Sequence, residues 1–458
     1  MSAWYEKAVF YHIYPFGLLG APKENHRKEE QKQEPSPNDT DPTAGSFNRL
    51  TPWISHMQKL GCTALYIGPL FESSSHGYDT RDFRQVDRRL GTNEEFQSFV
   101  RQCHEAGIRV VVDGVFNHTG REFFAFQDLI QKKEASSFRD WYRNVGFDWG
   151  SPMGDPFHYD CWQGHAVLPC LNLENPEVRR YLFETVHFWI HEFDIDGIRL
   201  DCANVLNFSF MSELREKTAA MKPEFWLMGE VIHGEYARWV NPQMLHSVTN
   251  YELHKALYSG HNDHNYFEIA HNVKRLEAVG PALYTFADNH DEDRLASKLL
   301  NQAHLYPVYQ LLFTLPGIPS IYYGSEWGIE GRRSSTSDEA LRPALDLAAC
   351  QDNQLTKQIE ALAKIHTENA AFHDGRYQEL FLTNRQYAFC RVKDQQILLS
   401  AVNNDEQTAQ ISVPVPFATE QARLLLTSSE QADETVFPVE NGRLTLTLPP
   451  CGGMILRL

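Results

Sequence analysis

The sequence has no apolar run long enough to cross a membrane, and basic residues are scarce in it. Its 458 residues include 42 Lys and Arg against 60 Asp and Glu, which gives a net charge of −18 at pH 7. A membrane-spanning helix needs roughly 20 apolar residues, and a surface of negative sign repels phosphates and acidic headgroups. We therefore expect a soluble globular protein that binds neither nucleic acid nor membrane.

Paired cysteine motifs and a secretory leader are also missing. The eight cysteines are widely spaced, without a CxxC pair, so we expect free thiols rather than disulfides or a zinc site. The first residues, MSAWYEKAVFYHIYPFG, have no basic segment ahead of an unbroken apolar core. This pattern predicts a cytoplasmic protein.

Short apolar runs alternate with longer amphipathic stretches, as in chains built from βα units. Helices are predicted between the runs, for example at 92–106 and at 176–193, the second with Asn175 as its cap and Pro176 in its first position. Eight strands with helical returns predict an α/β fold, a closed (β/α)8 TIM barrel. The eight predicted strands lie within 9–17, 64–71, 109–117, 197–201, 225–231, 247–252, 283–289 and 318–324.

Two insertions and a change of pattern divide the chain further. Residues 21–45 are polar and rich in proline, which predicts a solvated loop after the first strand. Residues 118–175 are too long for an ordinary loop and predict a small subdomain after the third strand. Beyond 370, alternating short runs predict an antiparallel β-sandwich. The predicted domains are a catalytic barrel of residues 1–117 and 176–369, an inserted subdomain of 118–175 and a C-terminal sandwich of 370–458.

Charged residues follow the apolar strands at the ends that meet on one rim of a barrel. They include Asp113, Asp201 with Arg199 two residues before it, Glu230 and Asp291. Such groups are costly to bury unless they pair with a cation, bind a ligand or perform acid/base work. Ion pairing explains any one of them, and a site for a hard metal ion is an alternative for the cluster. Several carboxylates around a cleft are nevertheless typical of glycosidic bond cleavage.

Four segments resemble, in order and spacing, the signature of the α-amylase family, glycoside hydrolase family 13. They are DGVFNH (113–118), GIRLDCAN (197–204), GEVIH (229–233) and FADNHD (286–291). The LPCLN segment (168–172) and the ANV after Asp201 are most similar to the neopullulanase, cyclomaltodextrinase and maltogenic amylase branch. The resemblance implies a retaining hydrolase that cleaves α-1,4-glucosidic bonds in maltodextrins, cyclodextrins or related α-glucans such as starch.

The resemblance also implies roles for seven residues at matching positions. Asp201 would be the nucleophile, Glu230 the general acid/base and Asp291 the third carboxylate, which favours the oxocarbenium-like transition state. Substrate-binding roles fall on Arg199, which holds Asp201 ionised, on Tyr78, which stacks on the sugar, and on His118 and His290, which donate to its hydroxyls. In the separate segment SDEALRPAL (337–345), Arg342 either reaches the non-reducing sugar or forms a surface ion pair.

No cofactor is required for this chemistry, and the expected partner is an α-glucan oligosaccharide or polysaccharide. Asn117 would be a calcium ligand only in those family members that carry a calcium site, which the relatives resembled here often lack, so we expect no bound metal. A 4-α-glucanotransferase, an α-glucosidase and a sugar phosphorylase are alternatives on the same scaffold. A catalytically silent barrel that only binds glycans is an alternative of another class. The aromatic pairs Phe123–Phe124 and Trp141–Tyr142 form either a small core or sugar platforms.

Overall fold

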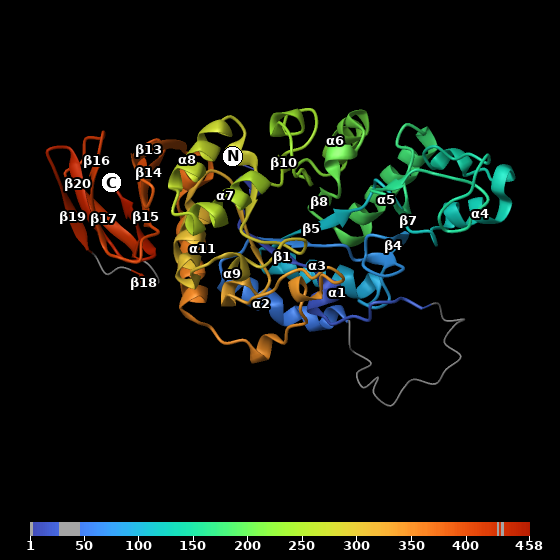
Figure 1. The fold of residues 1–458 in the computed structure, drawn as a ribbon, viewed down its shortest axis with the longest axis horizontal. Coiled ribbons are helices and arrows are strands. Elements are labelled where there is room, and N and C mark those ends of the chain that lie inside the picture. The colour runs from blue at the N-terminus through green and yellow to red at the C-terminus, as the bar shows by residue number, and fades with distance from the viewer. Residues whose placement is uncertain (1–2, 27–45, 428–429, 432–434) are drawn as a thin grey trace.

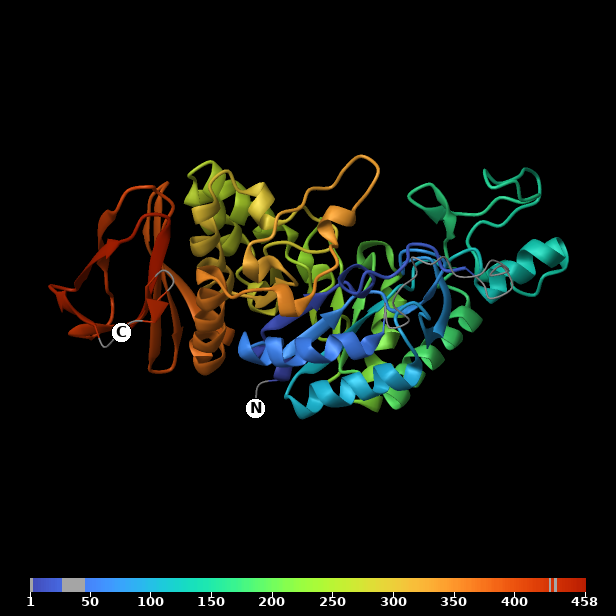
Figure 2. The same ribbon diagram turned by 90° about the horizontal axis from the view of Figure 1, so that it is seen from below.

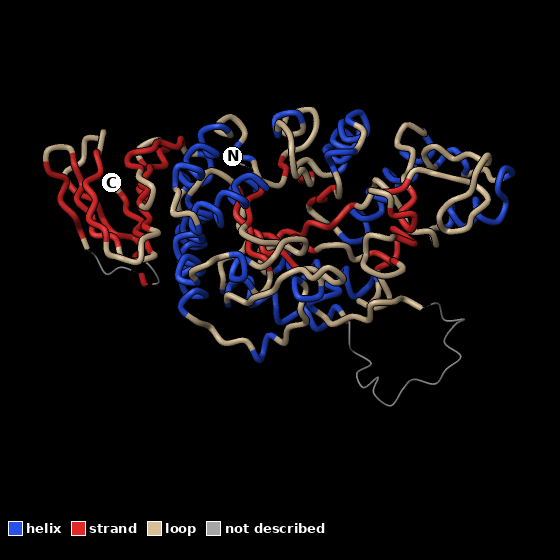
Figure 3. Tube along the Cα trace, viewed as in Figure 1, coloured by secondary structure: helices blue, strands red, loops and turns tan. Residues whose placement is uncertain are grey.

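The computed structural model describes residues 3–26, 46–427, 430–431 and 435–458. A central barrel lies between an inserted segment at one end and a sheet domain at the other, an arrangement visible in two perpendicular views (Figures 1 and 2). Figure 3 shows that the C-terminal end consists of strands, whereas helices surround the central part. None of the described helices is both long and apolar enough to cross a membrane.

Within the described residues, eight parallel strands form a ring. The order of the strands places each next to its sequence neighbour in the ring, β1 pairs with β12, and a parallel bridge from Thr249 to Tyr284 closes it. Every strand falls inside one of the predicted apolar runs, so the predicted TIM barrel is confirmed. The strands are β1 (Phe10–Ile13), β2 (Ala64–Ile67), β5 (Arg109–Gly114), β8 (Gly197–Leu200), β9 (Trp226–Gly229), β10 (Ser247–Val248), β11 (Tyr284–Phe286) and β12 (Ile318–Tyr322).

The helices lie outside the ring, and several of them begin at a capping residue. In α3, Thr92 and Glu95 form a capping box, and in α5 the Asn175 side chain accepts from the backbone N–H of Glu177 ahead of Pro176. The helices predicted at 92–106 and 176–193 are thereby confirmed. The longer helices around the barrel are α2 (Thr51–Lys59), α3 (Asn93–Glu105), α5 (Pro176–Phe193), α6 (Phe208–Met221), α7 (Tyr251–Asn262), α8 (Tyr266–Arg275), α10 (Leu305–Thr314) and α11 (Gln354–Glu368).

Aromatic side chains fill the barrel near the beginnings of its strands. Phe10 and Trp226 stack with ring centroids 5.0 Å apart, Tyr284 packs against Phe10 at 5.4 Å, and all three are buried. Apolar packing at this end leaves the opposite rim, where the strands end, for polar groups. The carboxylates predicted to follow the strands therefore lie at the opposite end of the barrel from this aromatic packing.

The segment between β5 and α5 contains α4 (Phe124–Lys132) and the strand pair β6 (Cys161–Trp162) and β7 (His165–Pro169). Phe123, Trp141 and Tyr142 are buried there, whereas Phe124 is 45% exposed and packs edge-on against Trp141. Three of the four aromatic residues thus form the small core of this segment, one of the two roles considered for them.

The C-terminal part is an antiparallel sandwich, as predicted, whose inner faces bury Leu399, Leu424 and Leu446. Gln310 of α10 fastens it to the barrel through three hydrogen bonds from its side-chain amide to Ser400 Oγ and to the carbonyl oxygens of Ala401 and Met454. The strands are β13 (Arg376–Leu382), β14 (Gln386–Lys393), β15 (Gln396–Asn403), β16 (Ala409–Pro414), β17 (Gln421–Thr427), β18 (Glu430–Gln431), β19 (Val436–Glu440), β20 (Arg443–Leu448) and β21 (Gly452–Arg457).

Other expectations concern single segments and residues. The loop 21–45, predicted to be solvated, is packed against the protein at its start, because Asn25 is buried and hydrogen-bonded to the Ser73 carbonyl. Residues 27–45 of this loop lie outside the described residues. All eight cysteines are free thiols. The exact domain boundaries stay predictions.

Candidate active site

The rim at the carboxyl ends of the strands brings the predicted site residues together. Arg199 lies in β8, Asp201 follows that strand directly, and Glu230 follows β9. Asp291 and His290 come after β11. The other three come from loops and reach the same rim: Tyr78 from the hairpin of β3 (Phe71–Ser73) and β4 (Thr80–Val86), His118 from the start of the inserted segment, and Arg342 from the chain after β12.

The Arg199 guanidinium forms ion pairs with three buried carboxylates. Its Nη1 lies 2.9 Å from Asp201 Oδ1 and 2.9 Å from Asp113 Oδ1, and its Nη2 lies 3.0 Å from Glu230 Oε1. Only 4% of the Arg199 side chain is exposed. Charge-assisted hydrogen bonds of this kind are short and strong in a buried site. Arg199 therefore orients Asp201 and Glu230, the predicted nucleophile and the predicted general acid/base.

The two predicted reacting carboxylates are close neighbours. Oxygens of Asp201 and Glu230 lie within 4.8 Å of each other. Carboxyl groups about 5–5.5 Å apart are typical of retaining glycosidases, and separations of about 6.5–9.5 Å are typical of inverting ones. The spacing leaves no room for a water molecule to attack from the far side of a sugar, and it favours a covalent intermediate.

Glu230 has the environment of a proton donor. Burial raises its pKa to about 7, and the nearby carboxylates of Asp201 and Asp291 act in the same direction, against the opposing charge of Arg199. Its Oε2 accepts the backbone N–H of Cys202 at 3.0 Å. A carboxyl group with a pKa near neutrality can both give and take a proton at physiological pH.

Asp291 is held in the opposite state by its neighbours. His290 Nε2 lies 2.9 Å from Asp291 Oδ2, and Arg342 Nη2 lies 2.8 Å from Oδ1. Although burial opposes the shift, these two neighbours lower the pKa of Asp291 well below its usual value. Arg342 also donates from Nε to the carbonyl of His290 at 2.9 Å, and its Nη2 lies 3.4 Å from Asp338 Oδ2. It therefore contacts both the predicted site and the ion-pair partner beside it.

Tyr78 links the two halves of this carboxylate network. Its hydroxyl lies 3.1 Å from Asp113 Oδ2 and 2.5 Å from His290 Nε2. Its backbone carbonyl lies 3.1 Å from His118 Nε2, and burial lowers the pKa of His118, which favours the neutral imidazole. All eight predicted site residues therefore stand in one connected cluster.

Asn117, the residue considered as a calcium ligand, makes its side-chain contacts through the amide nitrogen. The Asn117 amide nitrogen faces His118 Nδ1 at 3.2 Å and Cys170 Sγ at 3.9 Å, whereas calcium takes six to eight oxygen ligands. In the described part of the chain, the one group of three neighbouring His, Cys, Asp or Glu side chains that could share a metal ion is Asp201, Cys202 and Glu230. Arg199 already neutralises the two carboxylates of that group.

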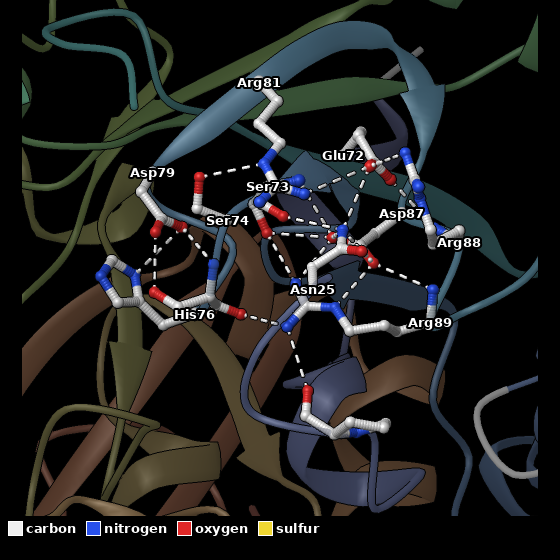
Figure 4. Close-up of polar contacts among 12 residues, drawn as sticks. Asn25, Glu72, Ser73, Ser74, His76, Asp79, Arg81, Asp87, Arg88 and Arg89 are labelled. Carbon is white, nitrogen blue, oxygen red and sulfur yellow. Dashed lines mark hydrogen bonds and ion pairs between the residues drawn. The ribbon is translucent and has the colours of Figure 1, made fainter. Parts of the chain in front are cut away.

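A buried polar network supports the hairpin that carries Tyr78 (Figure 4). Arg89 donates from Nε to Asp87 Oδ1 at 2.8 Å and from Nη2 to Asp87 Oδ2 at 2.7 Å. Asp87 is fully buried and also accepts from the backbone N–H and the hydroxyl of Ser73. The pair thus ties the strand β3 to the chain that follows β4.

The same arginine holds the chain that follows β1. Its Nη1 reaches the carbonyl oxygens of Pro22, Lys23 and Ser75 at 3.0, 2.9 and 2.5 Å. Ser75 in turn donates its backbone N–H to Asp79, next to Tyr78. The position of the Tyr78 ring therefore depends on contacts between three segments that are distant in the sequence.

Three further residues belong to the surroundings of the two predicted reacting carboxylates. Asp113, one of the charged residues predicted at the rim, shares Arg199 with Asp201, and burial raises its pKa. The Tyr251 hydroxyl lies 3.5 Å from Glu230 Oε1 and accepts from the Asn289 amide at 3.2 Å. Cys202 contacts both Asp201 and Glu230. Tyr251 follows a strand of the barrel, and this place in the sequence is a signal that could have pointed to it.

Comparison with known proteins gives a consistent result. The model of the α-amylase catalytic domain matches residues 31–396, and that of the α-amylase C-terminal all-β domain matches 381–458. The chain is 31% identical to a cyclomaltodextrinase of Bacillus sp over 431 residues, which are 88% of this chain and 74% of the relative. It is 29% identical to neopullulanase 2 of Thermoactinomyces vulgaris over 466 residues, 99% of this chain and 78% of the relative. Among solved structures, a debranching enzyme of Nostoc punctiforme is similar over 100% of both chains, with 30% identity and a TM-score of 0.86.

Proposed function

The chain belongs to the α-amylase family, and on this premise we propose that it is a retaining hydrolase of α-1,4-glucosidic bonds in maltodextrins and cyclodextrins. The observation that carries the proposal is the close approach of the Asp201 and Glu230 carboxylates, within 4.8 Å, with Arg199 bound to both. This spacing supports a double displacement.

In the first step the proton of Glu230 passes to the leaving glycosidic oxygen while an oxygen of Asp201 attacks the anomeric carbon. The glycosidic bond breaks and a covalent glycosyl-enzyme forms. Glu230, now ionised, then takes a proton from water, whose oxygen displaces Asp201 and releases the sugar with retained configuration. A pKa of Glu230 near 7 supports both halves of this cycle.

Asp291 and the residues bound to it would serve the sugar at the cleavage point. An ionised Asp291 accepts hydrogen bonds from sugar hydroxyls and stabilises the positive charge that develops at the transition state. Tyr78 covers the apolar face of the ring, and His118 and His290 donate to hydroxyls. The steps need no metal, and we propose that none takes part.

The experiment is a product profile with maltotriose, maltoheptaose, β-cyclodextrin, pullulan and starch, with and without phosphate. Glucose and maltose from the oligosaccharides and from the cyclic substrate, absent with Asp201→Asn, support the proposal. Longer products from maltotriose would make the protein a 4-α-glucanotransferase. Sugar phosphate formed with phosphate would make it a phosphorylase. The absence of products from every substrate would overturn the proposal.

A further inference from the structure

Cys202, the residue after the predicted nucleophile, contacts both reacting carboxylates. Its Sγ lies 2.9 Å from Asp201 Oδ2, and its backbone N–H donates to Glu230 Oε2 at 3.0 Å. The residue is 5% exposed. The segment GIRLDCAN (197–204) contains both Asp201 and Cys202, but the resemblance assigns a role to Asp201 alone.

The backbone of Cys202 adopts a conformation that favours glycine. Its φ of 51° and ψ of 38° lie in the left-handed helical region, which is unfavourable for a residue with a side chain. In this conformation the N–H and the thiol of one residue point at two different carboxylates. Strained residues of this kind persist where the surrounding contacts compensate for the cost, and they cluster at functional sites.

The thiol stays protonated in this position. Burial raises the pKa of the Cys202 thiol well above its usual value, and the charges of Asp201 and Glu230 raise it further. A protonated thiol is a hydrogen-bond donor and neither a nucleophile nor a metal ligand. The Arg199 guanidinium, bound to both carboxylates at 2.9 and 3.0 Å, also disfavours a cation in the same place.

We propose that Cys202 is a positioning residue for the reaction, a role that rests on the proposed function. Arg199 fixes Oδ1 of Asp201, and the Cys202 thiol fixes Oδ2, so both oxygens of the nucleophile are held. The backbone N–H of the same residue fixes Glu230. Cys202 therefore contacts the nucleophile with its side chain and the proton donor with its backbone, and helps to fix the position of one carboxylate relative to the other.

The weakness of the thiol as a donor is part of this role. An S–H group orients the carboxylate while it withdraws less electron density from the oxygen than a hydroxyl or an N–H group would. When Asp201 attacks the anomeric carbon, its oxygen has therefore lost little electron density to the hydrogen bond with the thiol. The sulfur keeps its proton throughout the cycle, and no bond to sulfur forms or breaks.

The test compares Cys202→Ala, Cys202→Ser and Cys202→Gly with the wild type in the pH dependence of kcat/KM for maltoheptaose. Loss of a donor to the ionised nucleophile makes protonation easier. The acidic limb should move up by about half a pH unit in the Ala variant, and kcat should fall by up to about tenfold with KM little changed. Serine, a stronger donor than the thiol, should bring the acidic limb back to its wild-type position or to a lower pH. Glycine, which keeps the N–H without strain, should behave like alanine.

The matched control is Cys390→Ala, which removes a buried thiol from β14 in the sandwich. We expect it to change the melting temperature and to leave the pH profile in place. Unchanged profiles in all three Cys202 variants would overturn the proposal.

A second measurement does not depend on activity. The infrared S–H stretching band of Cys202 should lie at the low frequency of a hydrogen-bonded thiol, vanish in Cys202→Ala and move to higher frequency in Asp201→Asn. A band at the frequency of a free thiol would overturn the positioning role even if the protein hydrolyses α-glucans. A hydrogen-bonded band in a protein that cleaves none of the substrates would instead locate the failure in the proposed function.

Discussion

The protonation of Glu230 should limit the activity on the alkaline side. Because the pKa of this carboxyl is about 7, about nine-tenths of the molecules carry the proton at pH 6 and about one-tenth at pH 8. The first step needs the protonated form, so kcat/KM for maltoheptaose should fall about tenfold between those two values. The sign is fixed by the role, because a proton donor loses activity as the pH rises through its pKa.

The leaving group provides a sharp assay of this reasoning. Fluoride departs from α-maltosyl fluoride with little need of a proton, so kcat/KM for this substrate should be nearly flat between pH 6 and 8. Glu230→Gln should lose about 10²–10⁴-fold in kcat/KM with maltoheptaose and less than about tenfold with the fluoride. The parameter to compare is kcat/KM, because it reports only the steps up to formation of the glycosyl-enzyme and excludes the later step in which Glu230 acts as a base.

The control is Glu213→Gln, which removes a half-exposed carboxylate on α6, where it pairs with Arg179 and Lys217. It should leave both pH profiles unchanged. An alkaline decline of equal size with the two substrates, or equal losses in Glu230→Gln, would refute the assignment of Glu230 as the proton donor.

Three further predictions concern the rest of the site and the stability. Asp291→Asn should lower kcat with maltoheptaose about 10²–10³-fold, because an ionised group near the developing positive charge is lost; a near-normal kcat would contradict this. Arg89→Met should lower the free energy of unfolding in urea by about 3–5 kcal/mol, because Asp87 keeps its buried charge, and Asp87→Asn in the same chain should recover part of it; a loss below about 1 kcal/mol would count against the network. Acid should destabilise the fold, because burial lowers the pKa of three histidines to about 3, so that the unfolded chain binds more protons than the folded one between about pH 6.5 and 3. Each of these histidines should lower the free energy of unfolding by about 2 kcal/mol at pH 5. Equal free energies of unfolding at pH 7 and pH 5 would contradict this. The three are His246, His261 and His366.

Local patterns were sufficient to predict the barrel and the polar ends of its strands. Apolar runs such as that before Asp201 can only be buried strands, and a charge directly after such a run must stand at the rim. Contacts between distant segments are a different matter. Arg88 and Arg89 are adjacent in the sequence, yet the Arg89 side chain is 5% exposed and that of Arg88 is 47% exposed. Nothing in the sequence separates them, because burial depends on carbonyl oxygens that the chain after β1 brings to Arg89.

Backbone conformation set a second limit on prediction from the sequence. The GIRLDCAN segment (197–204) contains Cys202, but the resemblance assigns no role to it, and its backbone is left-handed where the chain turns after β8. Cysteine is not a residue that predicts such a conformation, since glycine and asparagine favour it. Its two contacts with the reacting carboxylates could therefore be found only from the folded geometry.

The closure of the barrel between β10 and β11 makes one part of the wall thinner than the rest. β10 has two residues, and the Thr249–Tyr284 bridge and the hydrogen bond from the Asn250 N–H to the Tyr284 carbonyl at 2.8 Å join it to β11. Tyr251, whose hydroxyl reaches Glu230, is the next residue along the chain. Transient opening of this seam would carry Tyr251 away from Glu230, so the exchange rate of the Asn250 amide hydrogen measures how often the proposed proton donor loses a neighbour.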